Sequence, residues 1–169
     1  MSQRPADWDE PVVIPETPRP GRILIPFDGS HTAERALAWG TLAARNNDAE
    51  VVVVVAYDPP LTVRGRKAVY VEEMQASLEA EAKGLAEESV SLLLAQGVRA
   101  RGMVVRGDAS RAILTAAEQE DVDLIVLGRQ GVTHEVGRSV DLDAFRHLLT
   151  GGVAEKVTKH ATVPVLMVV

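Results

Sequence analysis

The stretch DVDLIVLGRQG, residues 121–131, is the part of the sequence that most clearly indicates the fold class. Residues 124–127 are apolar, which indicates a short buried strand, and the closely spaced glycines behind them indicate a sharp turn. The stretch TGGVAEKV, residues 150–157, begins a helical pattern with Gly151 and Gly152. Because glycine has no Cβ, backbone amides at such turns and helix starts can approach an anion closely. The pattern predicts a phosphate-binding turn, although glycines so placed can also serve only to turn the chain.

The same order of strand, turn and helix is repeated along the chain. Apolar runs typical of strands occupy residues 22–27, 50–57, 99–105, 124–127 and 165–169. Apolar residues three and four positions apart predict helices over residues 33–47, 68–96, 109–120 and 153–160. The predicted buried stripe of the longest helix consists of Met74, Leu78, Leu85, Leu92 and Leu93. This alternation predicts an α/β fold.

The alternation also indicates how the sheet is built and where a ligand binds. Right-handed crossovers place helices on both faces of an open parallel sheet. The run EVVVVVAY, residues 50–57, is apolar on both faces, as expected for a central strand. Ligands of such sheets bind beyond the carboxyl ends of the strands, so we expect one crevice at that edge. The turns expected to form it are residues 28–30, 56–59, 107–108 and 128–131.

Composition predicts a flexible tail, residues 1–20, followed by one soluble domain, residues 21–169. The tail holds five prolines among acidic residues, a composition that disfavours helix and strand. The chain of 169 residues is 46% hydrophobic and contains no apolar stretch long enough to cross a membrane. Its net charge of −6 disfavours nucleic acid as a partner. No secretory signal is visible, so the cytoplasm is the expected compartment.

Four segments together carry a family resemblance. They are RILIPFDGSHTAERALAWG, GDASRAIL, DVDLIVLGRQG and TGGVAEKVTKHATVPVLMVV, in this order between residues 22 and 169. In this combination they resemble the universal stress protein family. The resemblance implies a three-layer fold of the adenine nucleotide alpha hydrolase type, with five parallel strands in the order 3-2-1-4-5 and helices on both faces. It also implies a homodimer paired through the final strand, residues 165–169, which would cover an apolar open edge.

The phosphate-binding pattern of this family is matched only in part. Members that bind ATP carry two glycines separated by two residues and, about nine residues later, a glycine followed by Ser or Thr. Gly128 and Gly131 match the first half, and Gly151 with Gly152 the second. Residues 132–150 form an insertion, and Gly152 lacks the expected hydroxyl, which costs a hydrogen bond worth about 0.5–1.5 kcal/mol. A shorter register through Gly137 is the weaker match, because no helix of the family type follows it.

The resemblance also implies a set of nucleotide-binding residues. They are Pro26, Asp28, Ala56, Gly107, Leu127, Gly128, Arg129, Gly131, Gly151, Gly152 and Val153. Asp28 would accept hydrogen bonds from ribose hydroxyls or help hold Mg²⁺ on the phosphates, but an aspartate in this position can instead cap its own turn. Leu127 and Val153 are equally consistent with a plain core. The expected ligand is ATP or AMP, with Mg²⁺ as its candidate metal.

Dedicated catalytic patterns are not found in the sequence. There is no Walker A loop and no dinucleotide fingerprint, and the absence of cysteine excludes thiolate chemistry. Asp28, Ser30 and His31 lie too close together on one turn to form a catalytic triad. At most, slow ATP hydrolysis is expected. The favoured hypothesis is a nucleotide-binding regulatory or stress-response switch; the alternative is a nucleotide-free dimeric adaptor that acts through contacts with an unidentified protein partner.

Overall fold

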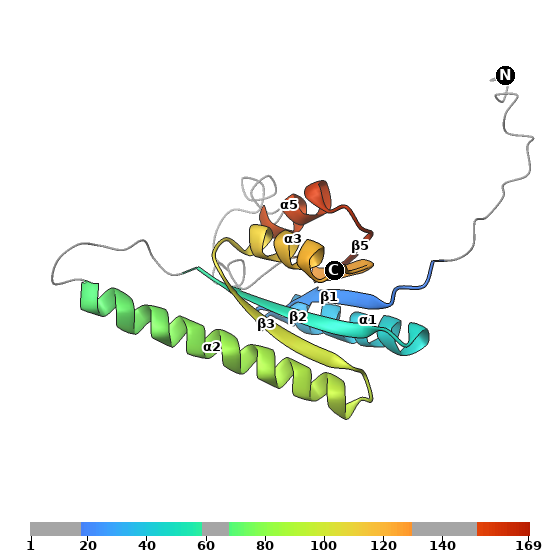
Figure 1. Ribbon diagram of the computed structural model, residues 1–169, viewed down its shortest axis with the longest axis horizontal. Helices are drawn as coiled ribbons and strands as arrows, with labels where there is room; N and C mark the ends of the chain where they lie inside the picture. Colours follow the sequence, from blue (N-terminus) through green and yellow to red (C-terminus); the bar gives the residue numbers. More distant parts are fainter. Residues whose placement is uncertain (1–17, 59–67, 130–151) are drawn as a thin grey trace, which may run out of the picture.

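The computed structural model describes residues 18–58, 68–129 and 152–169. Within these residues, strands and helices alternate along the chain as predicted (Figure 1). The elements are β1 Arg22–Pro26, α1 His31–Asn47, β2 Glu50–Tyr57, α2 Ala68–Ala95, β3 Ala100–Arg106, α3 Ala109–Gln119, β4 Leu124–Gly128, α5 Gly152–His160 and β5 Val165–Val168. The predicted insertion and most of the predicted tail lie outside the described residues.

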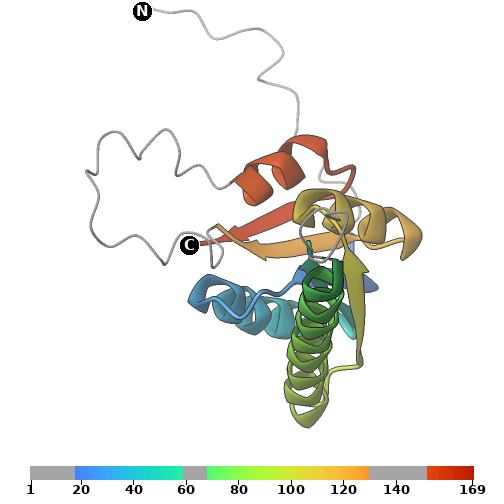
Figure 2. The ribbon, with the colours of Figure 1, turned by 90° about the vertical axis from the view of Figure 1, so that its left-hand side faces the viewer.

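The five strands form one parallel sheet in the order β3-β2-β1-β4-β5, which confirms the predicted strand order. Helices α1 and α2 cover one face of the sheet, and α3 and α5 cover the other (Figure 2). The strand order reverses between β1 and β4. The chain therefore leaves β1 toward α1 on one face and leaves β4 toward α5 on the other, an arrangement that opens a crevice between the two strand ends.

Helix α2 packs on the sheet through smaller residues than the sequence predicted. Leu93 is buried and Leu78 and Leu85 are half-buried as expected, but Met74 and Leu92 are about half exposed. The fully buried positions between Leu78 and Leu93 are Ala82, Ala86 and Ser89. The cause is a close approach to β3, because a Cβ at Gly102 would lie 3.2 Å from the Ala86 Cβ. The start of α2 also extends beyond the strands (Figure 1).

The amino ends of β1, β2 and β3 are joined by ion pairs. Glu50 pairs with Arg22 Nε at 3.2 Å and with Arg101 Nε at 3.3 Å, and Arg101 also pairs with Glu120 at the end of α3. The hydrogen bond from Arg101 holds the pKa of the Glu120 carboxyl below its ordinary value. The charged groups at this edge are therefore paired with one another.

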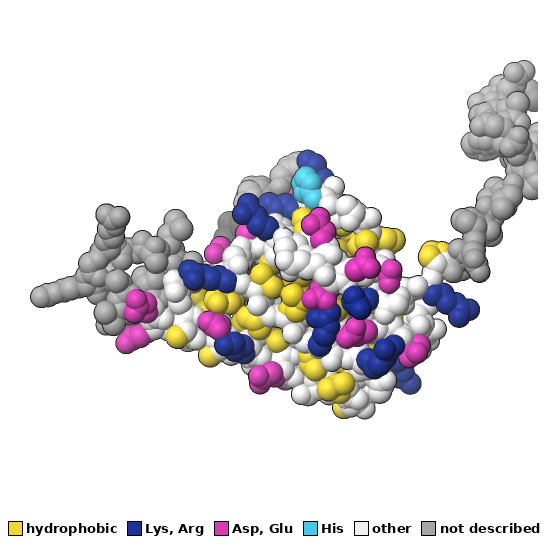
Figure 3. All heavy atoms as spheres, in the orientation of Figure 1, with side chains coloured by type: hydrophobic (Ala, Val, Ile, Leu, Met, Phe, Trp, Pro, Cys, Tyr) yellow, Lys and Arg dark blue, Asp and Glu magenta, His cyan; other side chains and the backbone are white. Residues whose placement is uncertain are grey.

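Charged side chains of both signs are mixed over the surface in view in Figure 3, where basic groups do not gather in one area. In the part of the chain that the structure describes, no helix is both long and apolar enough to span a membrane.

Candidate functional site

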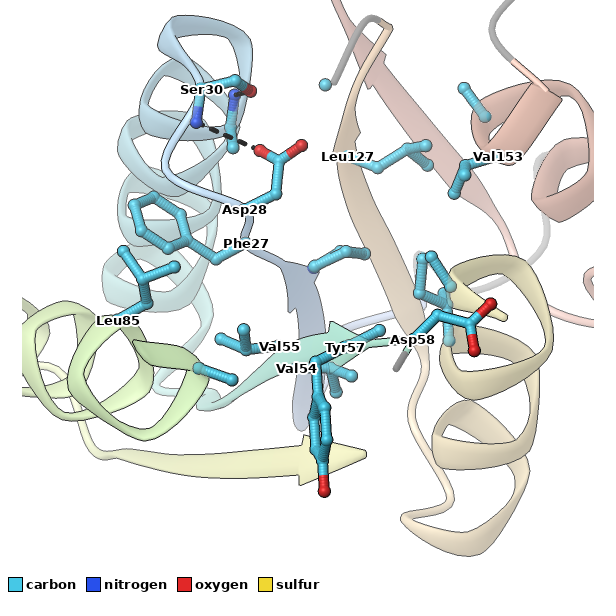
Figure 4. A pocket seen from close by; sticks show the side chains of 18 of the residues that line it. Phe27, Asp28, Ser30, Val54, Val55, Tyr57, Asp58, Leu85, Leu127 and Val153 are labelled. Atoms are coloured by element: carbon cyan, nitrogen blue, oxygen red, sulfur yellow. Dashed lines mark hydrogen bonds between the residues drawn. The ribbon is translucent and has the colours of Figure 1, made fainter. Parts of the chain in front are cut away.

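A cavity of about 680 Å³ lies at the carboxyl ends of β1, β2 and β4 (Figure 4). Cavities that hold small-molecule ligands commonly measure about 300–1,000 Å³. Its described lining residues come from the end of β1 and the turn after it, from the ends of β2 and β4, and from α1, α2, α3 and α5. The crevice predicted at this edge of the sheet is therefore present.

Asp28 belongs to the turn that joins β1 to α1. Its Oδ1 accepts a hydrogen bond from the Ser30 amide at 3.1 Å (Figure 4), and the Ser30 hydroxyl accepts one from the Ala33 amide at 3.2 Å. Ser30 is thus the N-cap of α1, and the turn-capping role considered for Asp28 is confirmed. Asp28 is also exposed and lines the cavity, so the two roles considered for its carboxylate do not exclude each other.

Gly128 is required by the packing of α1 against β4. A Cβ at this position would lie 2.7 Å from the Thr32 carbonyl carbon and 2.8 Å from its carbonyl oxygen. Only a residue without a side chain lets the first turn of α1 lie this close to the end of β4. Loss of ligand binding on substitution of Gly128 would therefore not by itself identify a phosphate contact, because the substitution also displaces α1.

The cavity carries basic groups on one side. Arg129 follows β4, where its amide donates to the Val168 carbonyl at 2.8 Å, and Lys156 lies one helical turn after Gly152 in α5. Lys156 Nζ is 3.8 Å from Asp108 Oδ2, too far for a hydrogen bond. The hydrogen bond from the Ser110 hydroxyl, followed by that from the Arg111 amide, holds the pKa of Asp108 below its ordinary value. Asp108 therefore stays charged near neutral pH and attracts Lys156 toward α3.

Gly152 is the first residue of α5 and contributes to the cavity wall. A Cβ added there would meet no atom of the described residues within 4 Å. In contrast to Gly128, packing against the described residues therefore does not require glycine here, and these residues leave room for the hydroxyl that the family pattern contains. The glycine keeps its backbone amide at the positive end of the α5 dipole.

The structure brings most of the predicted site residues together. Those that line the cavity are Pro26, Asp28, Ala56, Leu127, Gly128, Arg129, Gly152 and Val153. Gly107 follows β3 with a φ of 127°, a conformation that favours glycine, and it is not among the described lining residues. Gly131 and Gly151 lie outside the described residues.

A metal site made of protein groups alone is not found in the described part of the chain, which contains no cluster of three or more metal-ligating side chains. A Mg²⁺ ion at Asp28 would therefore need phosphate or water oxygens to complete its coordination.

Sequence reasoning missed one whole wall of the cavity. This wall is lined by Phe27, Tyr57, Leu78 and Leu85, and Lys156 on α5 was missed as well. The spacing of Lys156, one turn after Gly152, is a signal that could have identified it. No comparable signal marked Leu78 or Leu85, because an apolar stripe on a helix looks the same whether it faces a core or a cavity.

Comparison with known proteins identifies the family of this chain. The family model described as Universal stress protein family matches residues 20–169. The chain belongs to the universal stress protein family. A universal stress protein of Thermus aquaticus is 34% identical over 146 residues, which cover 86% of this chain and 96% of that protein.

Solved structures of similar fold support the same assignment. A universal stress protein of Methanocaldococcus jannaschii superimposes with a TM-score of 0.73 and 29% identity, over 88% of this chain and 94% of that one. A universal stress protein in complex with cAMP gives a TM-score of 0.63 over 90% of this chain and 99% of that one. At 22% identity, this second likeness concerns the fold alone.

We predict that Gly128→Ala lowers the free energy of unfolding by about 1–3 kcal/mol, because its methyl group overlaps the Thr32 backbone. The matched control is Gly84→Ala within α2, where a Cβ would meet nothing within 4 Å. The control is expected to leave stability unchanged or to raise it by up to about 1 kcal/mol. Urea unfolding measures both values, and a Gly128→Ala variant as stable as the wild type would contradict the packing described for α1 and β4.

Proposed function

We propose that this protein binds an adenine nucleotide, ATP or AMP, in the crevice at the carboxyl edge of the sheet and serves as a cytoplasmic regulatory or stress-response switch. One observation carries the proposal. The residues that the family pattern assigns to the nucleotide come from separate segments of the chain, around Asp28, Ala56, Gly128 and Gly152, and they line a single cavity. Three solved structures of similar fold are universal stress proteins with cAMP, dAMP or AMP bound, which supports the choice of ligand.

The distribution of charge in the cavity suits such a ligand. Arg129 and Lys156 both line the cavity, and Lys156 lies in the first part of α5, whose amides and dipole favour an anion, so the phosphates are proposed to bind there. Asp28 accepts hydrogen bonds and is proposed to meet the ribose hydroxyls. Apolar Leu127 and Val153 line the same cavity and provide a surface for the base.

Binding rather than efficient catalysis is proposed, because Ser30 and His31, the hydroxyl and the imidazole considered for catalysis, are engaged in the first turn of α1. The Ser30 hydroxyl accepts from the Ala33 amide, and His31 Nδ1 lies 3.0 Å from Glu34 Oε2. With Mg²⁺ bound to the phosphates, slow hydrolysis by an ordered water is the most that these groups would support.

The proposed homodimer uses the open edge of the sheet. β5 is the edge strand next to β4, and Leu166 and Met167 are each 39% exposed there. Pairing of two such edges would cover both the strand and its apolar side chains. The same edge also supports the second candidate function, a dimeric adaptor with an empty crevice. Sedimentation of the full chain as a monomer at micromolar concentration would contradict the dimer in either case.

Nucleotide binding is tested by thermal unfolding with ATP, ADP, AMP and cAMP, each with and without Mg²⁺. A ligand at a hundred times its Kd stabilises the folded state by about 2.7 kcal/mol, which shifts the unfolding midpoint upward by several degrees. We expect such a shift with at least one adenine nucleotide and none with inorganic phosphate at equal ionic strength. If no nucleotide moves the midpoint at millimolar concentration, the adaptor is the better proposal.

We predict that Lys156→Gln weakens binding in proportion to the charge of the ligand, because Lys156 provides a positive charge at the proposed phosphate position. The expected loss is about tenfold for ATP and smaller for AMP, with little change for adenosine. Lys159→Gln is the control, since Lys159 is an exposed residue of the same helix and is not among the described cavity residues. Calorimetry measures each Kd. An equal effect of both variants, or an equal effect on ATP and adenosine, would remove Lys156 from the site.

A further inference from the structure

The cavity extends well beyond the residues assigned to the nucleotide. We name its remaining part the α2 lobe, which is lined by Phe27, Val55, Tyr57, Leu78, Ala82 and Leu85. These residues come from the end of β1, from β2 and from α2. In Figure 4, Phe27, Val55 and Leu85 lie on the α2 side of the cavity, whereas Leu127 and Val153 lie on the opposite side.

The two parts of the cavity lie on opposite faces of the sheet. Phe27, Val55 and Leu85 belong to the apolar cluster between the sheet and the α1 and α2 helices. Val54, Leu127 and Ala154 line the same cavity but belong to the cluster under α3 and α5. The cavity therefore passes over the carboxyl edge of the sheet. We name the part on this second face, lined by Val54, Leu127 and Ala154, the α5 part. A ligand that filled the cavity would lie partly in the α5 part and partly in the α2 lobe.

The α2 lobe differs from the α5 part in its chemistry. Among the described lining residues, the two basic ones are Arg129, which follows β4, and Lys156 of α5, whereas α2 adds a single charged residue, the acidic Glu81. The nearby Lys83 is paired with Glu79 at 2.6 Å, and the Tyr57 hydroxyl donates to the same carboxylate at 3.4 Å. Among the described lining residues, a phosphate in the α2 lobe would meet no cation in exchange for its hydration, whereas an uncharged apolar group would be favoured.

Asp28 stands where the two parts of the cavity meet. Its neighbour Phe27 is directed toward Leu85 in the α2 lobe, while the Asp28 carboxylate lies on the side of Leu127 (Figure 4). Under the proposed function this carboxylate meets the ribose hydroxyls. A substituent on one of those hydroxyls would therefore start at the entrance of the α2 lobe, whereas a substituent on the phosphates would start at α5.

We propose that the ligand of this protein is an adenine nucleotide that carries an uncharged apolar group on its ribose, and that the α2 lobe holds that group. The proposal rests on the proposed nucleotide site and adds the chemical class of the ligand. The group is attached to a ribose hydroxyl through an ester or ether bond, which leaves the charge of the phosphates unchanged for contact with Arg129 and Lys156. Its apolar part is buried against Phe27, Leu78 and Leu85.

The test compares AMP with 2′/3′-O-(N-methylanthraniloyl)-AMP, whose aromatic group on the ribose serves as the probe. Calorimetry on the full chain is expected to give a Kd at least about tenfold lower for the probe, because burial of an aromatic group removes apolar surface from water. In Leu78→Gln, the ratio of the AMP Kd to the probe Kd is expected to fall toward one. Glutamine keeps a helix propensity close to that of leucine, so α2 is retained, which circular dichroism confirms.

Leu94→Gln is the matched control, because Leu94 lies on the same helix, is 55% exposed and is not among the described lining residues. Its Kd ratio is expected to equal that of the wild type. Equal affinity of the wild type for AMP and for the probe would overturn the ligand class while leaving the nucleotide site intact. An unchanged ratio in Leu78→Gln would also overturn it, as would an equal fall in Leu94→Gln. Failure of the wild type to bind either compound would overturn both proposals.

Discussion

The crevice depends on one close contact, that between the first turn of α1 and the end of β4. No side chain fits at Gly128, because a Cβ there would lie 2.7 Å from the Thr32 backbone. Ser30 and Asp28 fix the same turn through their own hydrogen bonds, so the end of β1 is held beside the end of β4. The two strands then lead to helices on opposite faces, and the space between these helices cannot be closed by the sheet itself.

Small residues determine the shape of the space that remains. On the α2 side, Ala82 and Ala86 bring the helix close to the sheet near its middle, while Leu78 and Leu85 stay half-buried at the cavity. On the α5 side, Gly152 leaves room that a larger residue would fill. The result is a cavity with basic groups on one face of the sheet and apolar groups on the other. This polarity is the physical basis for proposing both a phosphate and an apolar substituent on one ligand.

The sequence was sufficient to predict those features that follow from local pattern. The alternation of strands and helices depends on residues close together in the chain, and the structure confirms it. The strand order, which the family resemblance implied, is confirmed as well. The prediction of the buried stripe of α2 was wrong at Met74 and Leu92. Burial along this helix depends on how far the helix extends beyond the sheet and on how closely β3 approaches it. The α2 wall of the cavity was missed for the same reason. Helical periodicity identifies an apolar face but not the space in front of it.

The central claim is that an adenine nucleotide binds where the strand order reverses, and amide NMR spectra of the full chain titrated with AMP test it most directly. The account predicts saturable shift changes at Asp28, Ala56, Gly128 and Val153, which surround the cavity. It predicts no comparable changes at Asp48 and Gly97, which line a separate pocket at the ends of α1 and α2. Spectra that stay unchanged at millimolar AMP, or that change only around Asp48 and Gly97, would contradict it.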